Sequence, residues 1–269
     1  MEPRIIFLGT GGESLVTARQ LRSCGGIIIQ VEGYQFHIDP GPGALVKAAE
    51  YEVNVRNNTA VIVSQNELLH CSDVNAVIDS MTYGGLDRKG VLICNKSLVE
   101  GTEKIRPYLQ DFYMQCLERV IALNPHQRVG IENIEIRALK TDNKDPSALG
   151  FKFFTPKFVL SYSSDTKYRQ ELIKEYEKSD ILILNVLDPG SMKSDILNAN
   201  EAIKIIEKVK PRLAVITHFG IKMLKQDPIA ESREMSKKTG VQVIAAKDGL
   251  QVNPVSYSAQ LRQRTLLTY

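Results

Sequence analysis

The order of its apolar segments constrains this chain most, because each half begins with a hairpin and continues with strands alternating with helices. In the first half, residues 26–31 and 34–38 flank a short Glu32-Gly33 turn, which predicts a β-hairpin. In the second half, two phenylalanine-rich segments flank Pro156-Lys157 in the same way. Because the pattern occurs once in each half, we expect two sheets of mixed strand direction.

Shorter apolar segments accompany each hairpin, at lengths and spacings typical of buried strands and amphipathic helices. They predict an α/β fold in which two mixed β-sheets pack face to face with helices outside, a four-layer αββα sandwich. The expected strands are 4–8, 26–31, 34–38, 59–64, 91–94, 134–139, 151–154, 158–161, 181–186, 213–217 and 241–245, and the expected helices are 43–50, 73–81, 105–123, 167–178, 199–209 and 229–238.

The length and the absence of a linker favour a single domain. The 269 residues are 43% hydrophobic, which is enough for a substantial core. No segment rich in Pro, Gly or Ser separates the halves. We therefore expect one domain over residues 1–251, with 252–269 as a C-terminal extension of that domain or a tail.

Charge, the lengths of the apolar segments and the cysteine content argue against a nucleic-acid partner, a membrane and an oxidising setting. The 34 basic and 31 acidic residues nearly balance, so a nucleic-acid partner is not expected. No apolar segment approaches the roughly 20 residues needed to cross a bilayer, so no membrane association is expected. The four cysteines form no CxxC pair and no N-terminal leader pattern is present, which favours a reduced, cytoplasmic setting.

Several short motifs follow one another in an order that resembles a known family. In that order and spacing, the chain from about Arg4 to Val252 resembles the metallo-β-lactamase superfamily, in particular its microbial metal-dependent hydrolase-like branch. The resemblance implies the αββα fold and hydrolysis supported by metal ions. The motifs are Phe7-Leu-Gly-Thr-Gly-Gly12, Ile38-Asp-Pro-Gly-Pro-Gly43, Ser64-Gln-Asn-Glu-Leu-Leu-His70, Thr141-Asp-Asn-Lys-Asp-Pro146, Ser161-Tyr-Ser-Ser-Asp-Thr166, Thr217-His-Phe-Gly220 and Ala246-Lys-Asp-Gly249.

The resemblance also implies an incomplete set of metal ligands. Active members carry His-x-His-x-Asp-His after the strand that corresponds to residues 59–64, and these side chains bind two metal ions. Here Gln65, Glu67 and Leu69 replace the two leading histidines and the aspartate, and only His70 is retained. Asn143 stands where a further histidine is expected. The first metal position therefore has no histidine left.

The remaining ligands of the family are present. Asp165 and His218 match its bridging aspartate and final histidine. The resemblance therefore implies a site for one divalent metal ion, Zn, Fe, Mn or Mg, held by His70, Asp165 and His218, with Glu67 as a further ligand, or a site without metal. Taken singly, each histidine also fits a structural, hydrogen-bonded role, and Cys71 fits a buried, inert thiol better than a ligand or nucleophile.

Three functions are consistent with these residues. The first is a divergent metal-dependent hydrolase acting on a small molecule with an ester or phosphoester bond, with Asp165 and Glu67 as the candidate catalytic residues. The second is a non-catalytic relative that has lost the dinuclear metal centre and binds a ligand or a protein partner. The third, nucleic-acid processing, is the least favoured because no basic stripe is evident. Neither the substrate nor the oligomeric state follows from the sequence.

Overall fold

The computed structural model describes residues 2–190 and 195–258, which form two compact units. The first unit comprises the chain up to Asn124 together with Asp145–Ala148 and Lys247–Val252, and the second comprises Pro125–Lys144, Leu149–Ala246 and the residues from Asn253. The predicted single domain over 1–251 stays a prediction. Within the predicted C-terminal extension, Val252 lies in a strand, whereas 259–269 fall outside the described residues.

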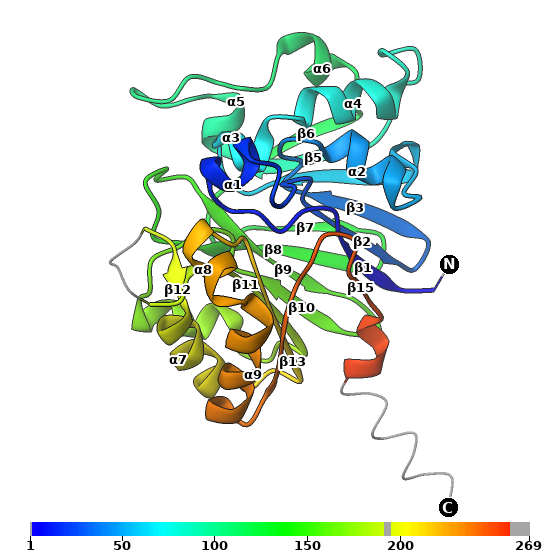
Figure 1. Ribbon diagram of the computed structural model, residues 1–269. Helices are drawn as coiled ribbons and strands as arrows, with labels where there is room; N and C mark the ends of the chain where they lie inside the picture. The colour runs from blue at the N-terminus through cyan, green and yellow to red at the C-terminus, as the bar shows by residue number, and fades with distance from the viewer. Residues whose placement is uncertain (1, 191–194, 259–269) are drawn as a thin grey trace, which may run out of the picture. The chain divides into compact units, whose positions relative to one another are not determined.

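The sheet of the first unit is mixed (Figure 1). Its strand order among the described residues is β15-β1-β2-β3-β4-β5-β6. Strands β15, β1, β2 and β3 pair antiparallel, and β3 to β6 pair parallel. The bounds are β1 (Arg4–Phe7), β2 (Ile27–Val31), β3 (Tyr34–Ile38), β4 (Asn58–Val63), β5 (Val91–Asn95), β6 (Arg119–Leu123) and β15 (Gln251–Val252). The predicted first hairpin is therefore confirmed as β2 and β3.

Short helices accompany this sheet, and the helix predicted at 73–81 is the longest of them. It is α4 (Val74–Thr82), whose apolar side chains pack with those of β4 and β5. Asp73 precedes α4 but caps a different helix, because its carboxylate accepts the N–H groups of Gly43 and Ala44. The other helices are α1 (Ser14–Ala18), α2 (Ala44–Glu50), η1 (Val55–Asn57), α3 (Leu68–Cys71), α5 (Lys96–Val99) and α6 (Asp111–Gln115).

The helix predicted over 105–123 is wrong. The structure has only α6 in this range, and the range ends in strand β6. Pro107 lacks a backbone N–H and disfavours helix for the residue before it, so the helix cannot begin where the pattern does. The β-branched Val120 and Ile121 then pair with β5.

The sheet of the second unit is also mixed (Figure 1). Its strand order is β14-β13-β11-β10-β9-β8-β7, and β12 pairs with β11 outside this path. Strands β7 to β10 pair antiparallel, whereas β10, β11, β13 and β14 pair parallel. The bounds are β7 (Arg128–Ile131), β8 (Ile134–Lys140), β9 (Leu149–Phe154), β10 (Val159–Tyr162), β11 (Ile181–Asp188), β12 (Leu197–Asn198), β13 (Leu213–Thr217) and β14 (Gln242–Ala245).

The helices of the second unit follow the prediction in two cases and depart from it in one. The predicted helices at 199–209 and 229–238 are α7 (Ala199–Val209) and α9 (Pro228–Thr239). The segment predicted as a helix at 167–178 is instead the 3₁₀ helix η2 (Gln170–Tyr176). The short α8 (Ile221–Gln226) and the 3₁₀ helix η3 (Pro254–Tyr257) were not predicted. Side chains of β11, β13, α7 and α9 form the main core of this unit.

Two further observations concern membrane association and the state of the cysteines. In the part of the chain that the structure describes, none of the helices has the length and apolar content of a bilayer-spanning segment. All four cysteines are free and buried.

Candidate functional site

The first unit places His70 just after strand β4. Helix α3 begins there, and Glu67 caps it by accepting the backbone N–H of Leu69 at 2.9 Å. The His70 side chain is buried, with 2% of its surface exposed. The end of a parallel strand followed by a short capped helix therefore fixes this histidine.

Asp39 orients the His70 ring. One oxygen of its carboxylate, Oδ2, lies 2.9 Å from Nδ1 of His70 and also accepts the Ser64 hydroxyl at 2.7 Å. The other, Oδ1, accepts the Ser64 N–H at 2.7 Å. A carboxylate only accepts, so Nδ1 of His70 carries the hydrogen and Nε2 has the lone pair that a metal ion needs. Histidine ligands in metalloproteins are commonly held by a carboxylate in this way.

Asp165 and His218 lie together in the second unit. Oδ1 of Asp165 is 3.3 Å from Nε2 of His218, and both side chains are buried. Two ligands with bonds of about 2.1 Å at a tetrahedral angle lie about 3.4 Å apart. The pair is therefore spaced as two ligands of one metal ion would be.

The parallel strands of the second unit explain this proximity. Asp165 follows β10 and His218 follows β13, and both strands pair in parallel with β11. The carboxyl ends of parallel strands lie at the same edge of a sheet, where ligand sites of such sheets are commonly found. His218 has a positive φ of 66°, which is uncommon outside glycine and marks a tight turn at the end of β13.

Asparagine side chains hold Asp165. Nδ2 of Asn185, on β11, donates to Oδ1 of Asp165 at 2.7 Å. Nδ2 of Asn143 donates to the backbone carbonyl of Asp165 at 2.8 Å. Asn185 is a site residue that the sequence did not reveal. The available signal was a polar residue within the apolar strand that ends at Asp188.

The residues in the other ligand positions differ in exposure. Gln65 is buried, Leu69 is partly buried, and Glu67 is exposed apart from its contact with the Leu69 N–H. Burial raises the pKa of the Cys71 thiol, so this cysteine is not held as a thiolate. That agrees with the interpretation of Cys71 as a buried, inert residue.

His70, Asp165 and His218 share the properties of metal ligands. All three are buried, and each offers one ligand atom of a type that binds divalent metal ions. Each of the three residues that the sequence singled out therefore has the chemistry of a metal ligand.

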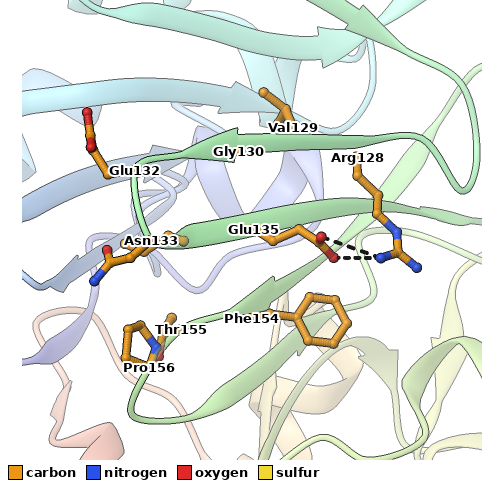
Figure 2. Close-up of a pocket in the computed structure, with 10 residues that line it drawn as sticks. Arg128, Val129, Gly130, Glu132, Asn133, Glu135, Phe154, Thr155 and Pro156 are labelled. Atoms are coloured by element: carbon orange, nitrogen blue, oxygen red, sulfur yellow. Dashed lines mark hydrogen bonds and ion pairs between the residues drawn. The ribbon is translucent and has the colours of Figure 1, made fainter.

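A surface pocket in the second unit lies on different residues (Figure 2). It has a volume of about 690 Å³ and lies along β7, β8 and the turn after Phe154. Arg128 donates to Glu135 across it at 3.1 Å. None of the predicted site residues lines this pocket.

Comparison with known proteins relates the chain to one family. The family model for the β-lactamase superfamily domain matches residues 34–219. An uncharacterized protein of Methanocaldococcus jannaschii is 31% identical over 255 residues, which cover 94% of this chain and 95% of that protein.

Solved structures show the same fold at low identity. The metallo-β-lactamase fold protein YhfI from Bacillus subtilis has a TM-score of 0.77 at 18% identity, covering 94% of this chain and 99% of its own. A diphosphatase from the PhnP family has a TM-score of 0.69 at 16% identity, covering 94% and 97%. Zn²⁺-bound PqqB from Methylobacterium extorquens has a TM-score of 0.70 at 11% identity, covering 93% and 99%.

Proposed function

Because the chain belongs to the metallo-β-lactamase superfamily, we propose that it is a metal-dependent hydrolase with a single metal ion. The proposed ligands are His70, Asp165 and His218. The observation that carries the proposal is the 3.3 Å spacing of the Asp165 carboxylate and the His218 ring. Two imidazoles and a carboxylate suit zinc, iron or manganese better than magnesium.

One ion is proposed because the other positions where the resemblance places metal ligands hold no histidine. Leu69 is apolar and cannot bind a cation. The amide nitrogen of Asn143 is directed at the backbone carbonyl of Asp165 and is not a metal ligand. Glu67 has a carboxylate, but this carboxylate caps α3 and is exposed.

In the proposed hydrolysis, each of these residues would have a different role. A bound divalent ion acts as a Lewis acid and lowers the pKa of water. Asp39 holds the His70 ring in the tautomer whose Nε2 can bind. Asp165 would orient the attacking water, and Glu67 is the exposed carboxylate available to take up its proton.

The proposed substrate is a small molecule with a phosphoester or ester bond. The support is that a structural relative is a diphosphatase of the PhnP family. The 34 basic and 31 acidic residues nearly balance, at a net charge of +3, which gives no reason to propose a nucleic acid as the substrate. The four free cysteines fit the reducing, cytoplasmic setting that we also propose.

A second candidate function is a non-catalytic relative that binds a ligand or protein partner. It is favoured by Leu69, which stands where the family has an aspartate that binds metal and transfers protons. In that case Asp165 and His218 would form a buried ion pair without metal.

Metal analysis of the full chain, purified without added metal, tests the proposal. We expect about one divalent ion per chain in the parent protein and almost none in His218→Ala, because the variant loses one of three ligands. His126→Ala is the matched control, since His126 is a half-exposed histidine of the second unit that contacts Glu175 instead.

Activity on a chromogenic phosphodiester distinguishes the two functions. We expect hydrolysis by the metal-loaded parent and His126→Ala, and a loss of at least about 100-fold in His218→Ala. Metal in neither protein would overturn the proposal. Stoichiometric metal without hydrolysis of phosphoesters or carboxylic esters would favour the binding protein.

A further inference from the structure

Asn185 contacts Asp165, a proposed metal ligand, although Asn185 itself is in none of the motifs that carry the family resemblance. It lies on β11, its side chain is buried, and Nδ2 donates to Oδ1 of Asp165 at 2.7 Å. The second hydrogen of the same amide faces the Tyr162 hydroxyl at 3.3 Å. The amide group therefore uses both of its donors, one of them on a proposed metal ligand.

The orientation of the Asn185 amide follows from the charge of its partner. Exchanging Nδ2 and Oδ1 would place an amide oxygen 2.7 Å from a carboxylate oxygen, which is repulsive. In the observed orientation, Oδ1 of Asn185 is buried and has no hydrogen-bond partner among the residues that the structure describes. A buried acceptor without a donor lowers stability, so stability alone does not explain an asparagine here.

The backbone pairing around Asn185 does not require its side chain. The backbone N–H of Asn185 donates to the Ser163 hydroxyl at 3.1 Å, and Leu160–Tyr162 of β10 pair with Ile181–Ile183 of β11. An apolar residue at this position would keep these bonds. The side chain is thus needed for Asp165 and not for strand pairing.

We propose that Asn185 is a positioning residue that fixes the Asp165 carboxylate for metal binding. This inference depends on the proposed metal-dependent function. Asp165 follows β10, outside regular structure, so strand pairing does not fix its position. The Asn185 amide holds Oδ1 of Asp165 at the position that lies 3.3 Å from Nε2 of His218. Partners of metal ligands commonly contribute 10- to 100-fold to metal affinity.

The Asn185→Leu substitution in the full chain tests this role. Leucine has nearly the same size but cannot donate to Asp165. We expect the dissociation constant for Zn²⁺, measured by competition with a chelator, to rise about 10- to 100-fold. Asn185→Ser is the second variant, for the case that the leucine variant does not fold. Serine is smaller than asparagine, and its hydroxyl is too short to replace the amide. We expect it to weaken Zn²⁺ binding to a similar degree.

Asn95→Leu is the matched control. Asn95 is also buried and also donates Nδ2 to an aspartate, Asp145, at 2.8 Å. Its Oδ1, like that of Asn185, has no hydrogen-bond partner in the described part of the chain. Asp145 is not a proposed ligand, so Asn95→Leu should leave the Zn²⁺ dissociation constant unchanged while changing the unfolding temperature of the metal-free protein. A purely structural role for Asn185 would give the same result as this control.

The outcomes separate this inference from the proposed function. If the parent binds no Zn²⁺, the proposed function fails, and the inference fails with it. If the parent binds Zn²⁺ and His218→Ala does not, but both Asn185 variants bind it as tightly as the parent, only the positioning role is overturned. A weaker affinity in both Asn185 variants with parent-like affinity in Asn95→Leu supports it.

Discussion

At the scale of single residues, Asp39 shows how one carboxylate can set the chemistry of a histidine. It accepts the N–H and hydroxyl of Ser64 and faces Nδ1 of His70. The two residues are 31 positions apart in the chain. The same carboxylate therefore binds a backbone N–H group and orients a histidine.

The Asp39→Asn variant should weaken metal binding. The amide nitrogen of asparagine would face Nδ1 of His70 as a donor, so the ring would move its hydrogen to Nε2 and lose the lone pair for the metal. We expect the Zn²⁺ dissociation constant to rise about 10- to 100-fold, measured by chelator competition.

A second aspartate in the same unit provides the control for Asp39. Asp248 also accepts one hydroxyl, from Thr10, and one backbone N–H, from Ser23, at 2.7 Å each, but neither of these partners is a histidine. Asp248→Asn should leave Zn²⁺ affinity unchanged. An equal loss in both variants would show that Asp39 only stabilises the fold.

At the scale of elements, the turn after β3 packs closely against helix α3. A Cβ atom added to Gly41 would lie 2.0 Å from the Leu69 carbonyl oxygen and 2.5 Å from that of Cys24. Both atoms belong to backbone, so neither can move without moving its segment. Glycine at this position lets α3, and with it His70, approach the turn that contains Asp39.

Gly41→Ala should therefore destabilise the protein by at least about 2 kcal/mol, because the added methyl displaces α3 or the turn. Urea denaturation measures this change. Gly130→Ala is the control, since Gly130 on β7 has no atom within 4 Å of the added Cβ and no positive φ, and we expect a change within about 0.5 kcal/mol. Equal stability of Gly41→Ala and the parent would contradict the close packing.

Helices and strands whose bounds depend on residues nearby in the sequence were predicted well. Those whose structure depends on pairing with distant strands were not. The predicted helix at 199–209 matches α7, whose start is fixed by a capping box between Asn198 and Glu201. The segment 105–123 has apolar residues that suit a helix or a strand, and pairing with β5 decides for strand at its end. The periodicity of the apolar residues alone does not show which neighbouring strand the segment will pair with.

At the scale of the whole molecule, acid stability depends on a buried histidine outside the proposed site. His37 on β3 is buried, and its Nε2 donates to the Gly25 carbonyl at 2.9 Å. Within residues 2–190 and 195–258, its Nδ1 has no hydrogen-bond partner. Burial lowers the pKa of His37 from 6.5 to about 4. A proton on Nδ1 would add a charge that no acceptor stabilises.

This shift should make the protein less stable as the pH falls below 6.5. Between pH 6.5 and about 4 the unfolded chain binds a proton at this histidine and the folded chain does not, so the His37 contribution is complete above 6.5 and is lost toward 4. From pH 7 to pH 5 the loss is about 2 kcal/mol.

Urea denaturation of the parent and His37→Leu at both pH values measures this contribution, because carboxylates titrate alike in the two proteins. The stability of the variant should fall by about 2 kcal/mol less than that of the parent over this range. An identical fall in both proteins would show that His37 does not titrate with a lowered pKa.

The sequence by itself determined the fold class and the candidate ligands of this protein. Two hairpins, each accompanied by alternating strands and helices, predicted two mixed sheets, and the resemblance to the metallo-β-lactamase superfamily is confirmed by the family match and the solved structures. The same resemblance singled out His70, Asp165 and His218. These features depend on local patterns and on motif order, which a sequence states directly.

Only the tertiary structure decided which side chains serve those ligands. Asp39 lies far along the chain from His70, and Asn185 is 20 residues from Asp165. Strand pairing brings Asn185 of β11 beside the end of β10, and the close packing at Gly41 brings the Asp39 turn to α3. No local pattern encodes these contacts, because they arise when separate strands and helices pack. They orient two of the proposed ligands, His70 and Asp165.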